Sequence, residues 1–156
     1  MNILGIDLGT TQSGICLLDP ETGQVSAKGV LTVKETRKFI KKNRAKIQMI
    51  AVELPVIYTR MMPGSNITLG IMLRECGRIE ECGALLKIPV VLITRADVCK
   101  VLTGRRPCKG TKVTKADTQE ALRLTLGLEQ PIRPQHSSDA GCVAYAAWRL
   151  TQEVAA

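Results

Sequence analysis

The stretch that most constrains this chain is residues 2 to 18, where an acidic residue stands inside an apolar run. Ile3, Leu4, Ile6 and Leu8 surround Asp7 in a pattern that is typical of a buried strand. A carboxylate in such a strand costs several kcal/mol of desolvation unless a metal, another cation or hydrogen-bond donors compensate it. Asp7 is therefore the first candidate functional residue.

The residues that follow predict a sheet that begins with three antiparallel strands. Residues 9 to 14 are rich in glycine and hydroxyl side chains and predict a turn, and residues 15 to 18 form a second apolar run. We therefore predict a β-hairpin that carries Asp7 near the centre of its first strand. Residues 25 to 33 follow another turn signal and are expected to complete a three-stranded meander.

A second acidic residue stands near the end of another predicted strand. Residues 35 to 46 predict a basic helix, whose charges fit a solvated face slightly better than direct DNA contact. Residues 47 to 55 then predict an apolar strand that carries Glu53. Because a helix precedes this strand, it should run parallel to the first strand and beside it. Glu53 would then lie beside Asp7. Two neighbouring carboxylates repel each other unless a divalent cation binds both. The alternative is that Glu53 caps a strand end that faces solvent.

Composition limits the class of protein. The 156 residues suit one domain over residues 1–156, and 45% hydrophobic residues suffice for a core. The net charge of +8 favours a polyanionic partner such as nucleic acid. The six cysteines form no Cys-x-x-Cys pair and lie mostly in apolar runs, so we expect free thiols in a reducing cytoplasm. No apolar run approaches the ~20 residues that span a bilayer, so we expect a soluble, cytoplasmic protein.

Two stretches in the middle of the chain suit macromolecular contacts. Tyr58 and Arg60 are large side chains in a predicted loop after Glu53, where stacking on bases and local packing explain them about equally well. Residues 67 to 86 predict a long helix with three glycines, which allow another helix to approach closely. A dimer face and ordinary core packing both fit this helix.

A basic loop follows in the second half of the chain. Residues 89 to 94 predict a strand parallel to the preceding one, and residues 96 to 102 predict a helix. The next loop contains no acidic residue and leads into a helix expected over residues 115 to 126. Such a charge run usually marks a solvated loop, but this one adds to an already basic chain, so we expect it to contact phosphates. Its cations are Arg105, Arg106, Lys109, Lys112 and Lys115.

The single histidine stands at the start of the last predicted helix. After two prolines, Ser137 or a neighbour is expected to cap a helix whose small apolar residues face inward. His136 and Asp139 are three residues apart, so their side chains can converge on one point at this helix start. A lone histidine before a helix is more often a surface residue. The nearby Asp139 is what favours a functional site.

The order of these parts resembles the RNase H-like fold, and within it the RuvC-like Holliday junction resolvases, most closely those of bacteriophage type. The resemblance covers nearly the whole chain, and its short motifs are fairly specific through their order and strand context. The motifs are Gly5-Ile-Asp-Leu-Gly-Thr10, Ala51-Val-Glu-Leu-Pro55, Leu69-Gly70, Gly77-Arg-Ile-Glu80, Lys109-Gly110 with Lys112, and His136-Ser-Ser-Asp-Ala140. The fold we expect is α/β, with a mixed five-stranded sheet of three antiparallel strands followed by two parallel ones and helices on both faces.

The resemblance also implies chemistry. The family has four metal-binding positions, which match Asp7, Glu53, His136 and Asp139. It implies an endonuclease that depends on Mg²⁺ or Mn²⁺, with two ions in each active site. It further implies a homodimer whose subunits each nick one strand of a four-way DNA junction in recombination and repair, leaving 5′-phosphate and 3′-hydroxyl ends.

The basic loop has a role in this implied mechanism. A lysine of the loop, Lys109 or Lys112, would stabilise the charge that develops on the phosphate or hold it in place. One feature departs from the family: residues 54 to 57 separate Glu53 from Tyr58, whereas the family's junction-wedging aromatic often follows the glutamate closely.

Two alternatives fit parts of the sequence. Residues 6 to 13 also resemble the first phosphate loop of DnaK-type chaperones and other actin-like ATPases, which need a second lobe and a second glycine-rich loop that this sequence does not show. The other alternative is a YqgF-type or other RNase H-like nuclease on branched DNA or RNA, or a protein that binds nucleic acid without cutting it. The intact carboxylates argue against binding alone, because an acidic cluster without a metal would repel phosphate. Bacterial and phage origin both stay open.

Overall fold

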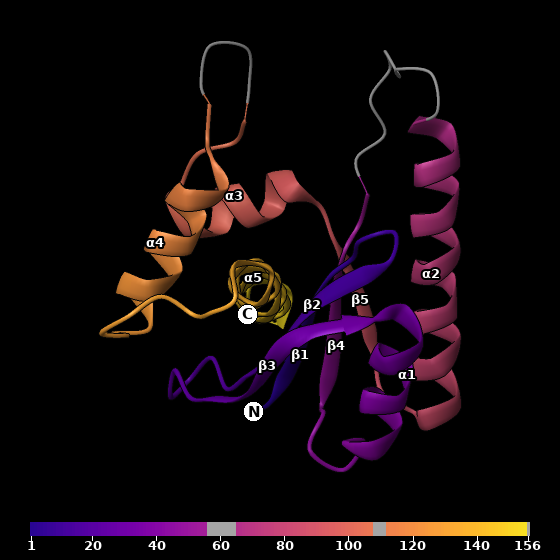
Figure 1. Cartoon of the computed structure of the whole chain (residues 1–156). Helices are drawn as coiled ribbons and strands as arrows, with labels where there is room; N and C mark the ends of the chain where they lie inside the picture. The colour runs from indigo at the N-terminus through magenta and orange to yellow at the C-terminus, as the bar shows by residue number, and fades with distance from the viewer. Residues whose placement is uncertain (56–64, 108–111, 156) are drawn as a thin grey trace.

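The computed structural model describes residues 1–55, 65–107 and 112–155 (Figure 1). Its sheet has five strands in the order β3-β2-β1-β4-β5. The strands are β1 (Ile3–Asp7), β2 (Gln12–Leu18), β3 (Val25–Thr32), β4 (Met49–Glu53) and β5 (Val90–Ile93). The helices of the described part are α1 (Val33–Lys42), α2 (Ser65–Leu86), α3 (Arg95–Thr103), α4 (Lys115–Thr125) and α5 (Gln135–Ala155).

The strand directions confirm the predicted mixed sheet. β2 pairs antiparallel with both β1 and β3, whereas β4 pairs parallel with β1 and with β5. Ile6 lies opposite Val52, so the next residues, Asp7 and Glu53, end neighbouring strands at the same edge of the sheet. Asp7 is the last residue of β1, and the prediction that it lies near the strand's centre is wrong. The reason is that its pair with Gly14 is the last of the hairpin, after which the chain turns.

Alternation along the strands produces two hydrophobic cores. Successive side chains of a strand point to opposite faces. Ile3 and Met49 belong to the core under α5, which α3 and α4 extend, and Leu4 and Ile50 belong to the core under α1 and α2. Helices therefore cover both faces of the sheet, as predicted (Figure 1). Asp7 is four residues after Ile3 in β1, and Glu53 is four residues after Met49 in β4. Residues an even number apart share a face of the sheet, so both acidic residues lie on the α5 side.

Two glycines allow α5 to lie directly on the sheet. A Cβ atom at Gly5 would stand 1.8 Å from the carbonyl oxygen of Ala140. At Gly14 it would stand 2.1 Å from the carbonyl oxygen of His136. No L side chain fits at such distances, so the first turns of α5 approach the strands at the level of Asp7.

Two helix ends differ from the predictions. α1 ends at Lys42, before the predicted end at residue 46, and the amide of Asn43 donates to the carbonyl of Phe39. α5 begins at Gln135, so Ser137 and its neighbours lie inside the helix, and the prediction that one of them caps it is wrong. The helix begins earlier because the amides of Ser137 and Ser138 already donate to the carbonyl of Pro134. The Ser137 hydroxyl instead donates to the carbonyl of Gly29 at 2.9 Å.

The described cysteines match the expectation of free thiols. Cys16, Cys76, Cys82, Cys99 and Cys142 are buried and unbridged, and Cys108 lies outside the described residues. Within the described ranges, no helix combines the length and apolar character needed to cross a membrane.

We expect Gly5→Ala to lower the free energy of unfolding by about 2 kcal/mol or more, because the new methyl group displaces α5 from the sheet. Urea denaturation measures this loss. Gly77→Ala is the matched control, because nothing lies within 4 Å of the position where its Cβ would stand. That variant should be about as stable as wild type or up to about 1 kcal/mol more stable. Equal stability of the two variants would contradict this account of the helix contact.

Candidate active site

Two carboxylates stand at the carboxyl ends of β1 and β4. Burial, followed by the negative charge of Asp7, raises the pKa of Glu53 above its usual range, and the positive charges of Lys115 and Arg95 oppose that shift. The Oε2 atom of Glu53 is buried and accepts no hydrogen bond from any described residue. A buried carboxylate oxygen without a donor costs free energy, which a bound cation would recover.

The first turn of α5 supplies two further candidate metal ligands. His136 Nδ1 lies 3.0 Å from Asp7 Oδ2, and its side chain is 65% exposed. The Asp139 side chain is only 2% exposed. One ligand atom from each of Asp7, His136 and Asp139 lies within 4.8 Å of the others. Glu53 is not part of this group of three, but the strand register places it beside Asp7.

Two polar residues of α4 hold the carboxylate of Asp139. Lys115 Nζ donates to Asp139 Oδ2 at 2.7 Å and lies 3.9 Å from Asp7 Oδ2. Gln119 Nε2 donates to Asp139 Oδ1 at 2.7 Å. Burial lowers the pKa of Lys115, but the hydrogen bond to Asp139 and the charges of Asp7, Asp139 and Glu53 outweigh it and raise that pKa above its ordinary value. Lys115 therefore stays an ammonium ion and neutralises part of the acidic cluster.

Arg95 fixes the start of α4 from the neighbouring helix. Its guanidinium donates to the carbonyl of Thr114 at 3.1 Å and to the hydroxyl of Thr118 at 3.2 Å. Thr114 caps α4 in a capping box with Asp117. Because Lys115 follows directly, the position of its side chain depends on this long-range contact between α3 and α4.

Sequence reasoning missed two residues of this site and placed a third elsewhere. Gln119 and Arg95 were not predicted, and Lys115 was expected only in the phosphate-binding loop. One local signal was available: Thr114 and Asp117 form the sequence pattern of a helix start, and Lys115 and Gln119 stand four residues apart, on one face of that helix.

The other predicted residues form no ion pair or hydrogen bond with these carboxylates among the described residues, or lie outside the described part. Lys112 is exposed and has no hydrogen bond or ion pair with a described residue, and Arg105 and Arg106 are exposed beyond the end of α3. Tyr58, Arg60 and Lys109 lie outside the described residues. The DNA contacts expected of all six stay predictions.

The donor set of this site fits a divalent cation. Three carboxylates provide the hard oxygen ligands that Mg²⁺ and Mn²⁺ prefer, and His136 adds one imidazole nitrogen, a softer ligand. The single positive charge of Lys115 faces the three carboxylates of Asp7, Glu53 and Asp139. Net negative charge therefore remains at this site, even though Lys115 is hydrogen-bonded to Asp139. The partnerless Glu53 Oε2 is the structural observation that favours an ion here. We refer to Asp7, Glu53, His136 and Asp139 as the acidic site.

Comparison with solved structures identifies the fold. No model of a known protein family and no curated protein matches the sequence. The structure of T. thermophilus RuvC in complex with Holliday junction substrate matches with a TM-score of 0.76 at 19% identity, over 99% of this chain and 96% of that one. Another Thermus thermophilus RuvC structure matches with a TM-score of 0.75 at 20% identity, over 99% and 97%.

A more distant resolvase has the same architecture. The yeast mitochondrial Holliday junction resolvase Ydc2 matches with a TM-score of 0.57 at 10% identity, over 97% of this chain and 80% of that one. The chain thus has the RNase H-like fold of the RuvC resolvases over almost its whole length. The resemblance predicted from short motifs is confirmed at the level of the fold.

We expect Glu53→Gln to raise the melting temperature of the metal-free protein at neutral pH. The pKa of Glu53 is raised above the ordinary 4.5 in the folded protein, so the folded state holds this proton more tightly than the unfolded chain. Stability therefore falls as pH rises from the ordinary pKa through the raised one, and the substitution removes this loss. Thermal melts in chelator at several pH values measure the difference, which should shrink toward pH 4.5.

Glu120→Gln is the control for this prediction, because its hydrogen bond with Arg123 lowers the pKa of Glu120. That exposed variant should gain no stability at neutral pH. A Glu53→Gln variant that melts at or below the wild-type temperature at neutral pH would contradict the assignment of Glu53 as an uncompensated carboxylate.

Proposed function

We propose that this protein is a metal-dependent endonuclease that resolves four-way DNA junctions by paired, symmetric nicks, leaving 5′-phosphate and 3′-hydroxyl ends. The observation that carries the proposal is the convergence of Asp7, His136 and Asp139 within 4.8 Å, beside Glu53, in a chain with the fold of RuvC. The solved RuvC complex contains a Holliday junction substrate. The net charge of +8 suits a nucleic-acid partner for this chain as well.

The acidic site would hold the metal ions. Asp7, Glu53, His136 and Asp139 would bind Mg²⁺, or Mn²⁺ in its place, with two ions per site. Such ions lower the pKa of an attacking water and stabilise the leaving 3′ oxygen. Within the chain, Gln119 holds the Asp139 carboxylate in one orientation, and His136 does the same for Asp7.

Lys115 is the residue that we assign to the scissile phosphate. Its ammonium already lies between Asp7 and Asp139, so a phosphate bound at the acidic site would lie within its reach. A fixed positive charge at this point stabilises the extra negative charge of the transition state. Lys112, the lysine expected from the sequence, is the alternative, and it lies three residues before α4.

Two subunits would supply the two nicks. A single acidic site cuts one strand at a time, and paired symmetric cuts require two sites related by a two-fold axis. We therefore propose a homodimer that acts on branched DNA in recombination and repair, in the cytoplasm of a bacterium or as a phage product. The basic-loop residues Arg105, Arg106, Lys109 and Lys112, with Tyr58 and Arg60, would contact the DNA around the cut.

We expect Asp7→Asn to abolish cutting while binding survives, because it removes the central ligand and leaves the fold intact. The measurement compares wild type and variant on labelled four-way junction, flap, linear duplex and RNA–DNA hybrid in Mg²⁺, with chelator as the blank. Paired, symmetric nicks in the junction alone support the proposal. Cutting of flaps or hybrids instead would keep a metal nuclease and overturn junction resolution. Binding of every substrate without any cutting would leave a binding protein.

We expect Lys115→Ala to slow single-turnover cleavage by about 100-fold at saturating protein, because the transition state loses a positioned charge. Lys112→Ala is the matched control, and its effect should appear mainly as weaker DNA binding. Thermal melting of both variants shows whether each is folded. The reverse pattern, with cleavage lost in Lys112→Ala and kept in Lys115→Ala, would reassign the catalytic lysine.

A further inference from the structure

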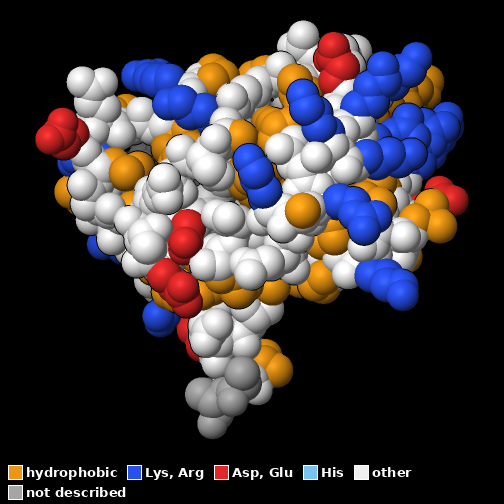
Figure 2. All heavy atoms as spheres, turned by 90° about the horizontal axis from the view of Figure 1, so that it is seen from below, with side chains coloured by type: hydrophobic (Ala, Val, Ile, Leu, Met, Phe, Trp, Pro, Cys, Tyr) orange, Lys and Arg blue, Asp and Glu red, His pale blue; other side chains and the backbone are white. Residues whose placement is uncertain are grey.

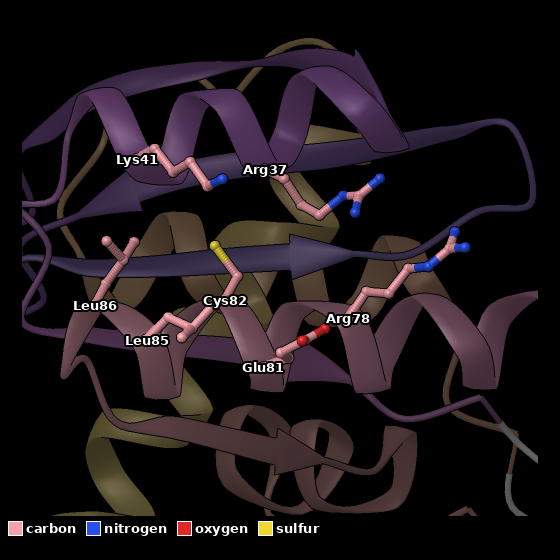
Figure 3. A pocket seen from close by; sticks show the side chains of 7 residues that line it. All are labelled: Arg37, Lys41, Arg78, Glu81, Cys82, Leu85 and Leu86. Carbon is pink, nitrogen blue, oxygen red and sulfur yellow. The ribbon is translucent and has the colours of Figure 1, made fainter.

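A basic groove lies on the side of the sheet opposite to α5. It runs between α1 and α2 and has a volume of about 340 Å³. Figure 3 shows Arg37 and Lys41 extending from α1 over the groove, while Cys82 points into it from α2. The residues that line it are Arg37, Lys41, Arg78, Glu81, Cys82, Leu85 and Leu86. The acidic site uses none of them.

The α1 side of this groove continues as a row of cations. Lys34, Arg37, Lys38 and Lys41 line an adjoining hollow, and their spacing places them on one side of the helix. Such a row extends for about 10 Å along the helix axis. We call these four residues the α1 stripe. In Figure 2 a dense group of Lys and Arg side chains covers the right of the molecule, the side on which α1 and α2 lie in Figure 1.

Acidic residues offset the α1 stripe only in part: Glu35 interacts with the charge of Lys38, and Glu81 lines the groove with Arg37 and Lys41. None of its four cations forms a salt bridge with a described acidic residue, whereas Arg78 across the groove pairs with Glu75. The Nε atom of Arg37 is buried and lacks a hydrogen-bond partner among the described residues. Like charges three and four residues apart on a helix repel each other. A polyanion that spans the row would remove this repulsion.

We propose that the α1 stripe binds the phosphate backbone of a DNA arm, away from the strand that is cut. Each strand of a duplex carries one phosphate per about 3.4 Å of its axis, so about three phosphates match the length of the stripe. Charge complementarity selects the occupant, because the four cations of the stripe attract a polyanion and would repel the same four cations of a second copy. The site rests on the proposed function, since it binds the same branched DNA.

The test is the salt dependence of junction binding in chelator. Lys34, Lys38 and Lys41 are exposed, so the triple variant Lys34→Gln, Lys38→Gln, Lys41→Gln should fold normally. The slope of log affinity against log salt, measured between about 50 and 200 mM, should fall in magnitude by about 2 to 3, at about 0.9 per lost phosphate contact. A second triple variant with Arg at the same positions should keep the wild-type slope.

A scattered variant controls for net charge. Lys28→Gln, Lys100→Gln, Arg149→Gln removes the same charge from exposed residues of β3, α3 and α5, and its slope should change by less than about 1. If the stripe binds an arm, wild type should prefer long-armed over short-armed junctions, and the stripe variant should lose this preference with unchanged cleavage rate at saturation.

The outcomes separate the stripe from the proposed function. If the salt slope of the stripe variant equals that of wild type, or falls only as much as that of the scattered variant, the stripe does not bind DNA. Junction cutting by wild type would be unaffected by that result. A wild-type protein that binds no junction would overturn the proposed function. Sedimentation shows whether the stripe variant is still a dimer. If the variant dissociates into monomers, the groove is an interface between copies, which would also overturn the proposal.

Discussion

The direct contact between α5 and the sheet determines the geometry of the acidic site. Asp7 comes from the first strand and Asp139 from the last helix, so only tertiary packing brings them together. Any side chain at Gly5 or Gly14 would hold α5 away from the strands, because the carbonyl oxygens of Ala140 and His136 occupy the space of its Cβ. His136 would then no longer lie 3.0 Å from Asp7. The close packing of α5 at these two glycines thus sets how near the side chains of α5 lie to Asp7.

The charges of the site are balanced only in part. Lys115 bonds to Asp139 and lies near Asp7, and Arg95 contributes a more distant positive charge. One oxygen of Glu53 has no donor among the residues that the structure describes, and the pKa of Glu53 is raised. A fold selected for stability alone would replace such a residue with a neutral one, because an unpaired buried charge destabilises the native state. Its presence is most simply explained by a cation that binds in the working protein.

The sequence predicts the acidic residues better than the residues that hold them. Asp7 and Glu53 follow from apolar runs of period two and from the crossover rule, which makes β4 parallel to β1. His136 and Asp139 follow from their spacing at a helix start. The contacts of Lys115 and Gln119 depend instead on how α4 packs against α5, and Arg95 of α3 joins the start of α4 through hydrogen bonds to Thr114 and Thr118. No local pattern encodes that pairing.

The same limit explains the errors at the element ends. Ser137 and Ser138, shortly after Pro134, have the pattern of a capped helix beginning near Ser137, yet α5 starts at Gln135 because the amides of both serines donate to the carbonyl of Pro134. The Ser137 hydroxyl donates to the carbonyl of Gly29, which is 108 residues away in the chain, and does not cap the helix. Asp7 was placed mid-strand because the apolar run continues to Leu8, whereas the hairpin register ends at Asp7 and Gly14. In both cases a pairing partner, rather than composition, decides the boundary.

A polyanionic substrate raises a problem that the distribution of charge on this chain addresses. In the proposed function, Asp7, Glu53 and Asp139 would repel phosphate at the point of cutting, so the acidic site itself would contribute little to DNA affinity before cations bind. Affinity would then come from cations elsewhere, and the α1 stripe on the other side of the sheet offers four of them. Binding and cutting would reside in different residues with opposite charge. Neutralising a carboxylate weakens cutting but relieves repulsion of the substrate, whereas neutralising the α1 stripe weakens binding and leaves the chemistry of the bound strand unchanged.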